Sequence, residues 1–369
     1  MFFFKKIKLE NFRNFSNFEI EFNDQCNVII GLNGSGKTNL LESLSMFEKG
    51  RGLRKDLFYN MINNNNKDKI FTINSIFNTL PNEVNLTLTC ERINKNLKKK
   101  ILVNGNKDKI SINHLEEMYS IIWFLPEMER LFLSSPSLRR NFIDRLIYGI
   151  DKSYLRFVNI YKKKILERNA IIKQKKFDLE WLSQIEKEIV FSGLTIYNKR
   201  KKHIENINSI IIALSELEIK QHFFKLKISD NFFNIINTEK EDDQKLIYLS
   251  EIKKHREYDS IVGGCKIGPH KSDILAFHFQ DNLYMNFCST GQQKASILLM
   301  IIAQCKYLKN ELNRQPILLF DEVCSHFDKN NRKILLDLIN SLNVQTFFTG
   351  TEKNIFSFLS TKATYYYIK

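Results

Sequence analysis

A glycine-rich stretch near the start of the chain has the residue types and spacing of a phosphate-binding loop. Gly31–Thr38 reads GLNGSGKT, with the spacing Gly-x4-Gly-Lys-Thr, and an apolar run precedes it. Glycines permit a tight turn whose N–H groups point at phosphate oxygens, the lysine neutralises the β- and γ-phosphates, and the threonine hydroxyl binds Mg²⁺. The pattern predicts a strand, a nucleotide-binding loop and a helix from Asn39 to Phe47 whose positive end faces the anion. The alternative is a strand-to-helix turn without a ligand. The predicted nucleotide-binding residues are Gly31, Leu32, Asn33, Gly34, Ser35, Gly36, Lys37 and Thr38.

Two carboxylates end an apolar run in the last quarter of the chain. Ile317–Phe320 is continuously apolar and leads directly into Asp321 and Glu322. Such a run is typical of a buried parallel strand, which would carry both acids to the sheet edge beside the phosphate loop. We expect Asp321, with Thr38, to hold Mg²⁺, and Glu322 to act as the general base on the attacking water. The alternative is a strand that ends in exposed acids. The predicted catalytic residues are Glu322 and Lys37, and the predicted cofactors are ATP and Mg²⁺.

A third motif, a polar turn, precedes that strand. Cys288–Ser296 reads CSTGQQKAS and leads into an apolar helix. A Ser-x-Gly-Gln turn at a helix start offers N–H groups and a hydroxyl to an anion. One chain has only one γ-phosphate to bind, so we expect this second turn to bind the ATP held by a second subunit. The alternative is an ordinary helix N-cap.

The placement of glycine and proline indicates how the chain positions these motifs. Between Gly149 and Gly263 there is no proline and only one glycine, Gly193, which suits long helices, the second of them starting near Trp181. Strict alternation over Val84–Cys90 indicates a half-buried strand, and Asn104-Gly105 predicts a hairpin turn. We therefore predict an α/β fold in which one lobe, residues 1–124 and 261–369, is split by a mainly helical lobe, residues 125–260.

Composition favours an anionic partner. The 369 residues carry a formal net charge of +15, which favours nucleic acid first and a membrane surface second. A general bias toward lysine is the alternative explanation. The six cysteines lack the C-x-x-C spacing, which suggests free thiols in a reducing cytoplasm. No apolar stretch is long enough to span a membrane, so we expect a cytoplasmic protein. The candidate DNA contacts are Arg51, Arg54, Lys98 and Lys99.

The three motifs, in this order, resemble those of ABC-type ATPases. The resemblance implies a head-to-tail dimer in which Ser289, Gly291 and Gln292 act on the partner's nucleotide. Ser325–Asp328 lies where that superfamily has its D-loop, which adds Asp328 to the nucleotide-binding residues. The superfamily often has a switch histidine where this chain reads FFTGT, and Thr349 would substitute for it. This departure suits a slow switch more than fast hydrolysis.

Motif spacing and further stretches resemble the RecF family. The gap between Thr38 and Ser289 exceeds that of transporter motor domains, and the insert lacks the long coiled coil of Rad50-like and SMC-like heads. The resembling stretches are Leu9–Phe15, Gly50–Asp56, Phe124–Ile147 and Ile267–Ile274. The resemblance implies an ABC-type P-loop ATPase head with an inserted helical lobe. It also implies an ATP-dependent homodimer that clamps duplex DNA near single-strand gaps, a weak DNA-dependent ATPase activity, and work with RecR, RecO and RecA.

Several alternatives are compatible with the sequence. A Rad50-like or SMC-like head that recruits a nuclease is one, and a transporter motor subunit is another. Arg139 and Arg140 would contact DNA or the other lobe, or would simply be solvated helix residues. His270 is interpreted as a core histidine with a hydrogen-bonded ring. Arg13 and Asn14 are placed near the adenine.

Overall fold

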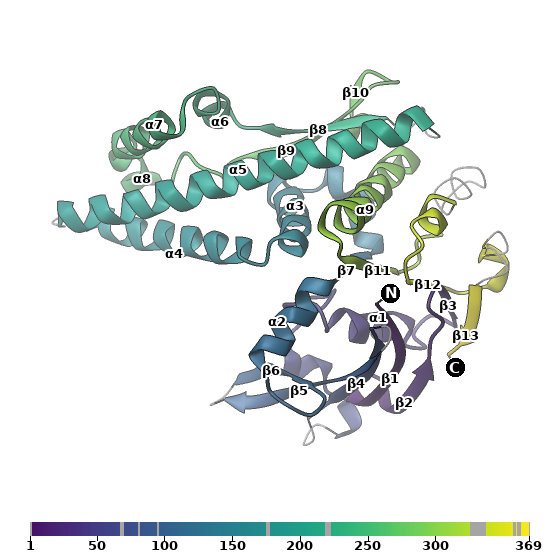
Figure 1. Ribbon diagram of the computed structural model, residues 1–369. Coiled ribbons are helices and arrows are strands. Elements are labelled where there is room, and N and C mark those ends of the chain that lie inside the picture. Colours follow the sequence, from purple (N-terminus) through teal and green to yellow (C-terminus); the bar gives the residue numbers. More distant parts are fainter. Residues whose placement is uncertain are drawn as a thin grey trace. The chain divides into compact units, whose positions relative to one another are not determined.

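The chain forms two compact units in the computed structural model (Figure 1). One unit contains Met1–Glu129 and Ile297–Lys369, and the other contains Arg130–Ser296. The first is an α/β unit and the second is mainly helical, in keeping with the predicted α/β fold with a helical insertion. The structure describes residues 2–66, 70–79, 82–93, 96–174, 178–217, 223–324, 337–356, 359 and 363–368.

A parallel five-stranded sheet supports the predicted site in the first unit (Figure 1). Its order is β13-β3-β12-β11-β7, so β12 lies between the strand before the phosphate loop and the strand before Asp321. The register aligns Phe320 of β11 with Phe348 of β12, and Phe348 with Val28 of β3. The carboxyl ends of these strands therefore meet at one edge, and the predicted buried parallel strand is confirmed. The strands are β13 (Ala363–Tyr367), β3 (Cys26–Ile30), β12 (Thr346–Gly350), β11 (Gln315–Phe320) and β7 (Tyr119–Phe124).

The second sheet of this unit is antiparallel, with the order β2-β1-β4-β5-β6. The predicted alternating strand lies within β5, and Leu86, Leu88 and Cys90 face the core. Asn104 and Gly105 both have positive φ, as a two-residue turn requires, but only one bridge, Val103 to Asn106, follows. The predicted second hairpin strand is wrong because α2 (Lys109–Met118) begins there. The strands are β2 (Phe15–Glu21), β1 (Phe3–Phe12), β4 (Thr72–Asn78), β5 (Glu83–Ile93) and β6 (Asn96–Val103).

One hydrophobic core joins both sheets of the first unit to α1 (Lys37–Ser45). Leu40, Leu41 and Leu44 of this helix are fully buried with Leu9 of β1 and Phe347 of β12. Burying a leucine completely contributes about 1.5–3 kcal/mol. This packing fixes the helix that follows the phosphate loop. Short 3₁₀ helices complete the unit: η1 (Phe58–Met61), η2 (Asn64–Asn66) and η6 (Lys353–Phe356).

The second unit is built around α5 (Leu179–Leu217), and α4 (Tyr154–Ile172) packs along it (Figure 1). The predicted helical character and the long helix near Trp181 are confirmed. A three-stranded antiparallel sheet, β10-β9-β8, accompanies the helices. The other elements are α3 (Pro136–Ile150), α6 (Asn231–Ile236), α7 (Glu241–Lys254), α8 (Arg256–Val262), β8 (Phe224–Ser229), β9 (Asp273–His278), β10 (Leu283–Tyr284) and η5 (Met285–Phe287).

The limits of the second unit differ from the predicted lobe of residues 125–260. Residues 261–296 were expected in the split ATPase lobe, but they belong to the second unit because β9 pairs with β8. Two elements contribute to both units: η3 (Pro126–Leu133) and α9 (Thr290–Leu312). Over the described part of the chain, none of the helices combines the length and apolar character that a bilayer crossing requires.

Candidate nucleotide site

The phosphate loop, Gly31–Thr38, joins β3 to α1, as predicted from its pattern. Gly36 has φ +105°, in the left-handed region that favours glycine, and a Cβ there would lie 2.5 Å from the Asn14 Nδ2. Asn14 Nδ2 donates to the Ser35 carbonyl oxygen at 3.2 Å, and Asn14 Oδ1 accepts from Asn39 Nδ2 at 2.8 Å. The turn between β1 and β2 therefore braces the loop and the start of α1.

Lys37 lies inside the loop and is only 4% exposed. Its Nζ donates to the carbonyl oxygens of Gly31 at 2.8 Å and Leu32 at 3.0 Å. An ammonium group has three N–H donors, so it can exchange carbonyl partners for phosphate oxygens without moving the backbone. The lysine is thus positioned where the loop pattern predicts the phosphates.

A network of hydrogen bonds joins the loop to the ends of two strands. Thr38 Oγ1 lies 3.1 Å from Asp321 Oδ1 and 2.9 Å from Asp321 Oδ2. Thr349 Oγ1, on β12 between them, donates to Asp321 Oδ1 at 2.7 Å. Asp321 is 5% exposed and Thr349 is fully buried. Hydrogen bonds to a buried carboxylate are stronger than those between neutral groups, so this network fixes the orientation of Asp321.

Glu322 has an uncommon backbone conformation for a residue with a side chain. Its φ is +49°, and its N–H donates to Thr349 Oγ1 at 3.0 Å. A single hydroxyl therefore accepts from the backbone of Glu322 and donates to the carboxylate of Asp321. Thr349 therefore contacts both acidic residues and fixes their positions. This contact gives a structural reason for the hypothesis that Thr349 substitutes for a switch histidine.

The Ser289–Gln292 turn lies in the second unit, at the start of α9. The Ser289 N–H donates to Gln292 Oε1 at 2.9 Å, and the Gln292 N–H donates to Ser289 Oγ at 3.3 Å. These reciprocal bonds form a capping box. Ser289 is exposed, and a Cβ added at Gly291 would meet no other atom within 4 Å. The turn is therefore a helix N-cap, as the alternative interpretation expected. Its outer face is open to solvent.

Comparison with known proteins decides the family. The sequence model of the family described as "RecF/RecN/SMC N terminal domain" matches residues 3–367. The chain belongs to the RecF/RecN/SMC family. A relative from Rickettsia bellii (strain OSU 85-389), named "DNA replication and repair protein RecF", is 34% identical over 95% of this chain and 94% of its own length. A relative of the same name from Rickettsia typhi (strain ATCC VR-144 / Wilmington) is 33% identical over the same shares.

Solved structures agree with the RecF/RecN/SMC fold. A structure described as "the recombination mediator protein RecF-ATP in RecFOR pathway" has a TM-score of 0.77 and 26% identity, and covers 95% of this chain and 94% of its own. An Smc head bound to the C-winged helix domain of ScpA has a TM-score of 0.52 and 17% identity, covering 96% of this chain and 91% of its own. This second likeness concerns the fold alone. Family membership favours the RecF interpretation over the transporter alternative.

Several other residues that were expected near the nucleotide or the DNA can also be compared with their predicted roles. The Arg13 guanidinium donates to both carboxylate oxygens of Glu42, each at 2.8 Å, and to Asp56 at 3.1 Å. The placement of Arg13 at the adenine is therefore replaced by a structural role, whereas Asn14 does contact the loop. Arg54 Nη1 donates to Asn39 Oδ1 at 2.7 Å. Asp328 lies outside the described residues.

The stretch that most resembles the RecF family forms ion pairs inside the second unit. Arg139 binds both carboxylate oxygens of Asp273, at 2.8 and 2.7 Å, and Arg140 donates to the Ser272 carbonyl oxygen at 2.5 Å. Arg139 is 12% exposed, so it is not the solvated helix residue considered above. Both arginines join α3 to β9 or the residue before it.

His270 has the structural role expected of it. Its Nδ1 lies 2.7 Å from Tyr161 Oη, and its Nε2 lies 2.8 Å from the Cys265 carbonyl oxygen. Burial lowers the pKa of His270 to about 4. The ring is therefore neutral at physiological pH and belongs to the core of the second unit.

The candidate DNA contacts differ in how accessible their side chains are to a DNA phosphate. Arg51 and Lys98 are exposed, and the Arg51 guanidinium lies 5.9 Å from the centre of the Phe58 ring. Arg54 is 41% exposed. Lys99 Nζ donates to the Glu48 carbonyl oxygen at 2.6 Å. Lys99 is therefore the weakest of the four candidates for a DNA contact. β6, which carries Lys98, contacts η1, which carries Phe58.

Sequence reasoning missed two carboxylates that matter for the geometry. Glu42 is fully buried within α1 and holds Arg13, and Asp281 accepts from Gln292 Nε2 at 2.5 Å. Glu42 could have been noticed as a charged residue among the apolar positions of the helix. Nothing in the local pattern distinguishes Asp281 from an ordinary turn residue.

Proposed function

We propose that this chain is an ATP-dependent DNA-binding protein of recombinational repair and replication restart. ATP would join two copies head to tail, and slow hydrolysis would separate them. The observation that carries the proposal is the Thr38–Asp321–Thr349 network beside Lys37. Support comes from relatives named "DNA replication and repair protein RecF" and from a similar structure described as RecF-ATP.

The oxygens of Thr38 and Asp321 fit a magnesium ion. A hydroxyl and a carboxylate are hard oxygen ligands, and Mg²⁺ usually combines one or two such groups with waters and substrate phosphates. Their separation of about 3 Å is close to the spacing of adjacent ligands around one small ion. When bound, Mg²⁺ would supply positive charge to the β- and γ-phosphates.

The chain's own groups would prepare the phosphates for attack by water. Loop N–H groups and the start of α1 would orient the phosphate oxygens, and Lys37 would exchange its carbonyl partners for them. Glu322 would accept the proton of the attacking water at its carboxylate. Thr349 would hold the backbone of Glu322 in place through the bond to its N–H.

The Ser289–Gln292 turn would complete the site of a second copy. Its exposed serine, its open glycine and the positive end of a long helix all suit an anion. Because the phosphate loop already holds the γ-phosphate of its own nucleotide, the turn has a ligand only in a dimer. We infer a homodimer with two nucleotides at its interface.

Closure of this dimer would clamp duplex DNA near single-strand gaps. The net charge of +15 supports an anionic partner, and Arg51, Arg54 and Lys98 are exposed or partly exposed candidates for phosphate contacts. RecR, RecO and RecA are the proposed protein partners, and the description of the similar structure, which names the RecFOR pathway, supports RecR and RecO. ATPase activity would be weak and DNA-dependent. An SMC-like head that recruits a nuclease remains the second candidate.

One experiment tests the proposal as a whole. Mass by light scattering and DNA affinity by fluorescence anisotropy are measured with and without ATP and Mg²⁺ on duplex, single-stranded and gapped DNA. We expect ATP to produce dimers and to strengthen duplex binding, and we expect affinity to fall steeply with salt. Dimers that form equally without ATP would contradict the scheme.

A positive charge introduced at the turn separates dimer closure from nucleotide binding. Ser289→Arg should leave ATP binding by the monomer intact and prevent dimer formation, because a long cation would occupy the open face. Ser135→Arg is the control, since Ser135 is an exposed N-cap in the same unit and makes no side-chain capping bond. Equal dimerisation of both variants would exclude the turn from the interface.

A further inference from the structure

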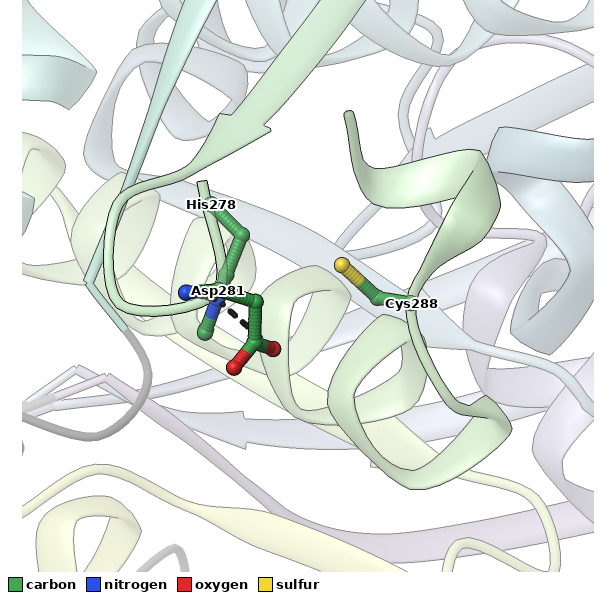
Figure 2. Close-up of side chains that lie close together, drawn as sticks. All are labelled: His278, Asp281 and Cys288. Atoms are coloured by element: carbon green, nitrogen blue, oxygen red, sulfur yellow. Dashed lines mark hydrogen bonds and ion pairs between the residues drawn. The ribbon is translucent and has the colours of Figure 1, made fainter. Parts of the chain in front are cut away.

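Three side chains of different chemistry gather next to the Ser289–Gln292 turn (Figure 2). His278 ends β9, Asp281 lies in the turn before β10, and Cys288 follows η5. One ligand atom from each residue lies within 4.8 Å of the others. The nucleotide site uses none of these three side chains.

The histidine and aspartate are already at the spacing of ligands around one ion. His278 Nδ1 lies 3.2 Å from Asp281 Oδ2 and 3.4 Å from the Asp281 backbone nitrogen. Two acceptor atoms this close repel each other unless a proton or a cation lies between them. His278 is fully buried, whereas the Asp281 side chain is 35% exposed, so a cation would enter from the aspartate side.

The ligand atoms are those that zinc selects. An imidazole nitrogen, a carboxylate oxygen and a thiolate sulfur bind Zn²⁺ at about 2.0–2.3 Å in tetrahedral geometry. Cys288 Sγ makes only a long contact, 3.7 Å, with the Tyr284 carbonyl oxygen. A rotation of this half-buried side chain would bring its sulfur toward the other two ligands. The fourth position would face solvent.

A neighbouring amide holds the aspartate in place. Gln292 Nε2 donates to Asp281 Oδ2 at 2.5 Å, and Gln292 Oε1 accepts from the Ser289 N–H. Such outer hydrogen bonds orient the carboxylate ligands of metal sites and raise their affinity. The same contact links the cluster to the Ser289–Gln292 turn.

We propose that His278, Asp281 and Cys288 bind a transition-metal ion, Zn²⁺ by the chemistry of the ligands, at a second metal site in this protein. The ion would fix the β9–β10 turn against the start of α9. An effect of the ion on dimer closure rests on the proposed function, whereas metal binding itself does not.

Cobalt titration of the 369-residue chain tests the site directly. Co²⁺ reports tetrahedral coordination by its visible absorption and thiolate coordination by a charge-transfer band, and Zn²⁺ should displace it. We expect one equivalent to bind with both signals. Cys288→Ser should remove the charge-transfer band, and Asp281→Asn should weaken binding at least about tenfold.

Two control variants separate this site from adventitious binding. Cys90→Ala removes a thiol of the first unit, and His114→Asn removes an exposed imidazole, and both should bind Co²⁺ as the unaltered chain does. Circular dichroism checks that Cys288→Ser and Asp281→Asn fold. The proposal is overturned if the unaltered chain shows no thiolate band. It is equally overturned if both site variants keep the original Co²⁺ affinity, as expected when a protonated histidine merely pairs with Asp281.

Discussion

The two elements proposed to hold phosphate are built in different ways. At the phosphate loop, a hydrogen bond joins Thr38 to Asp321 across 283 residues of sequence, and the fully buried Thr349 completes the network. In the Ser289–Gln292 turn, the side-chain bonds join residues at most 11 positions apart. The loop site is therefore a product of the tertiary fold, and the turn is a local structure.

This difference has consequences for folding and binding. A site fixed by packed strand ends keeps its geometry before the ligand arrives, which lowers the ordering cost of binding. A capped helix start on the surface has its own hydrogen bonds satisfied and becomes a phosphate site only when a ligand is presented to it. Substitutions at the loop site should already weaken nucleotide binding by a single chain, whereas substitutions at the turn should act mainly on the association of two chains.

The largest effect is expected at Lys37. Lys37→Ala should weaken ATP binding by about 100-fold or more, because Lys37 is the only lysine in the loop Gly31–Thr38. Fluorescent-nucleotide titration measures the loss. Lys49→Ala is the control, since Lys49 is 41% exposed in the same unit and pairs with Glu116. Near-normal affinity in Lys37→Ala would remove the loop from the site.

Glu322 tests catalysis separately from binding. Glu322→Gln should lower the ATPase rate by about 100-fold while ATP affinity stays within about threefold, because the amide cannot accept the proton of water. Single-turnover hydrolysis and nucleotide titration together measure this. Glu352→Gln, an exposed position after β12, should change neither. A normal rate in Glu322→Gln would exclude this residue as the base.

Thr349 tests whether the loop site depends on the fold around it. Thr349→Val keeps the shape but leaves the Glu322 N–H without its acceptor, so we expect a loss of about 1–3 kcal/mol in the free energy of unfolding. The Mg²⁺ requirement for ATP binding should rise as Asp321 loses one of its two hydroxyl donors and is held less firmly. Urea denaturation and Mg²⁺ titration provide the measurements. Thr349→Ser retains the hydroxyl and should restore both properties.

The same contrast explains what the sequence could predict. The loop pattern, the apolar run of β11 and the Ser-x-x-Gln cap are each contained in a few neighbouring residues, and all were recognised. The ion pair of Arg139 is not predictable from the local pattern because its partner, Asp273, is 134 residues away. The membership of residues 261–296 in the second unit is not predictable from the local pattern because it depends on the pairing of β9 with β8, which lie far apart in the sequence. Thr349 was noticed, but its two hydrogen bonds depend on the order of the strands.

The two units should also differ in their response to acid. Burial lowers the pKa of His270 to about 4 and that of His203 to about 3, both in the second unit. The unfolded chain binds these protons below its ordinary histidine pKa of 6.5, while the folded unit does not. The contribution of these two histidines to the free energy of unfolding is therefore complete above pH 6.5 and is lost as the pH falls toward 4.

For His270 alone this loss amounts to about 2 kcal/mol at pH 5. Urea denaturation at pH 7 and pH 5 checks it, and His270→Asn should reduce the difference between the two pH values. His114→Asn, at an exposed position of the first unit, should leave the difference unchanged. A pH difference that His270→Asn does not reduce would show that the acid response arises elsewhere.

The smallest effect on the single chain is expected at the Ser289–Gln292 turn. Gln292→Ala removes the bond from the Ser289 N–H and the bond to Asp281, yet both groups remain accessible to water, so we expect a loss of only about 1 kcal/mol. ATP affinity of the monomer should not change. Dimer formation with ATP should weaken, because the turn is the element that meets the second nucleotide.

Gln293→Ala provides the matched control for that substitution. Gln293 is buried and its Nε2 donates to the Cys288 carbonyl oxygen at 3.0 Å, so its removal also disturbs the start of α9 but leaves the open face unchanged. If Gln292→Ala lowers monomer ATP affinity as strongly as it lowers dimer formation, the turn belongs to the same chain's nucleotide site. In that case, the contrast between a self-contained loop site and a turn that serves a second chain is wrong.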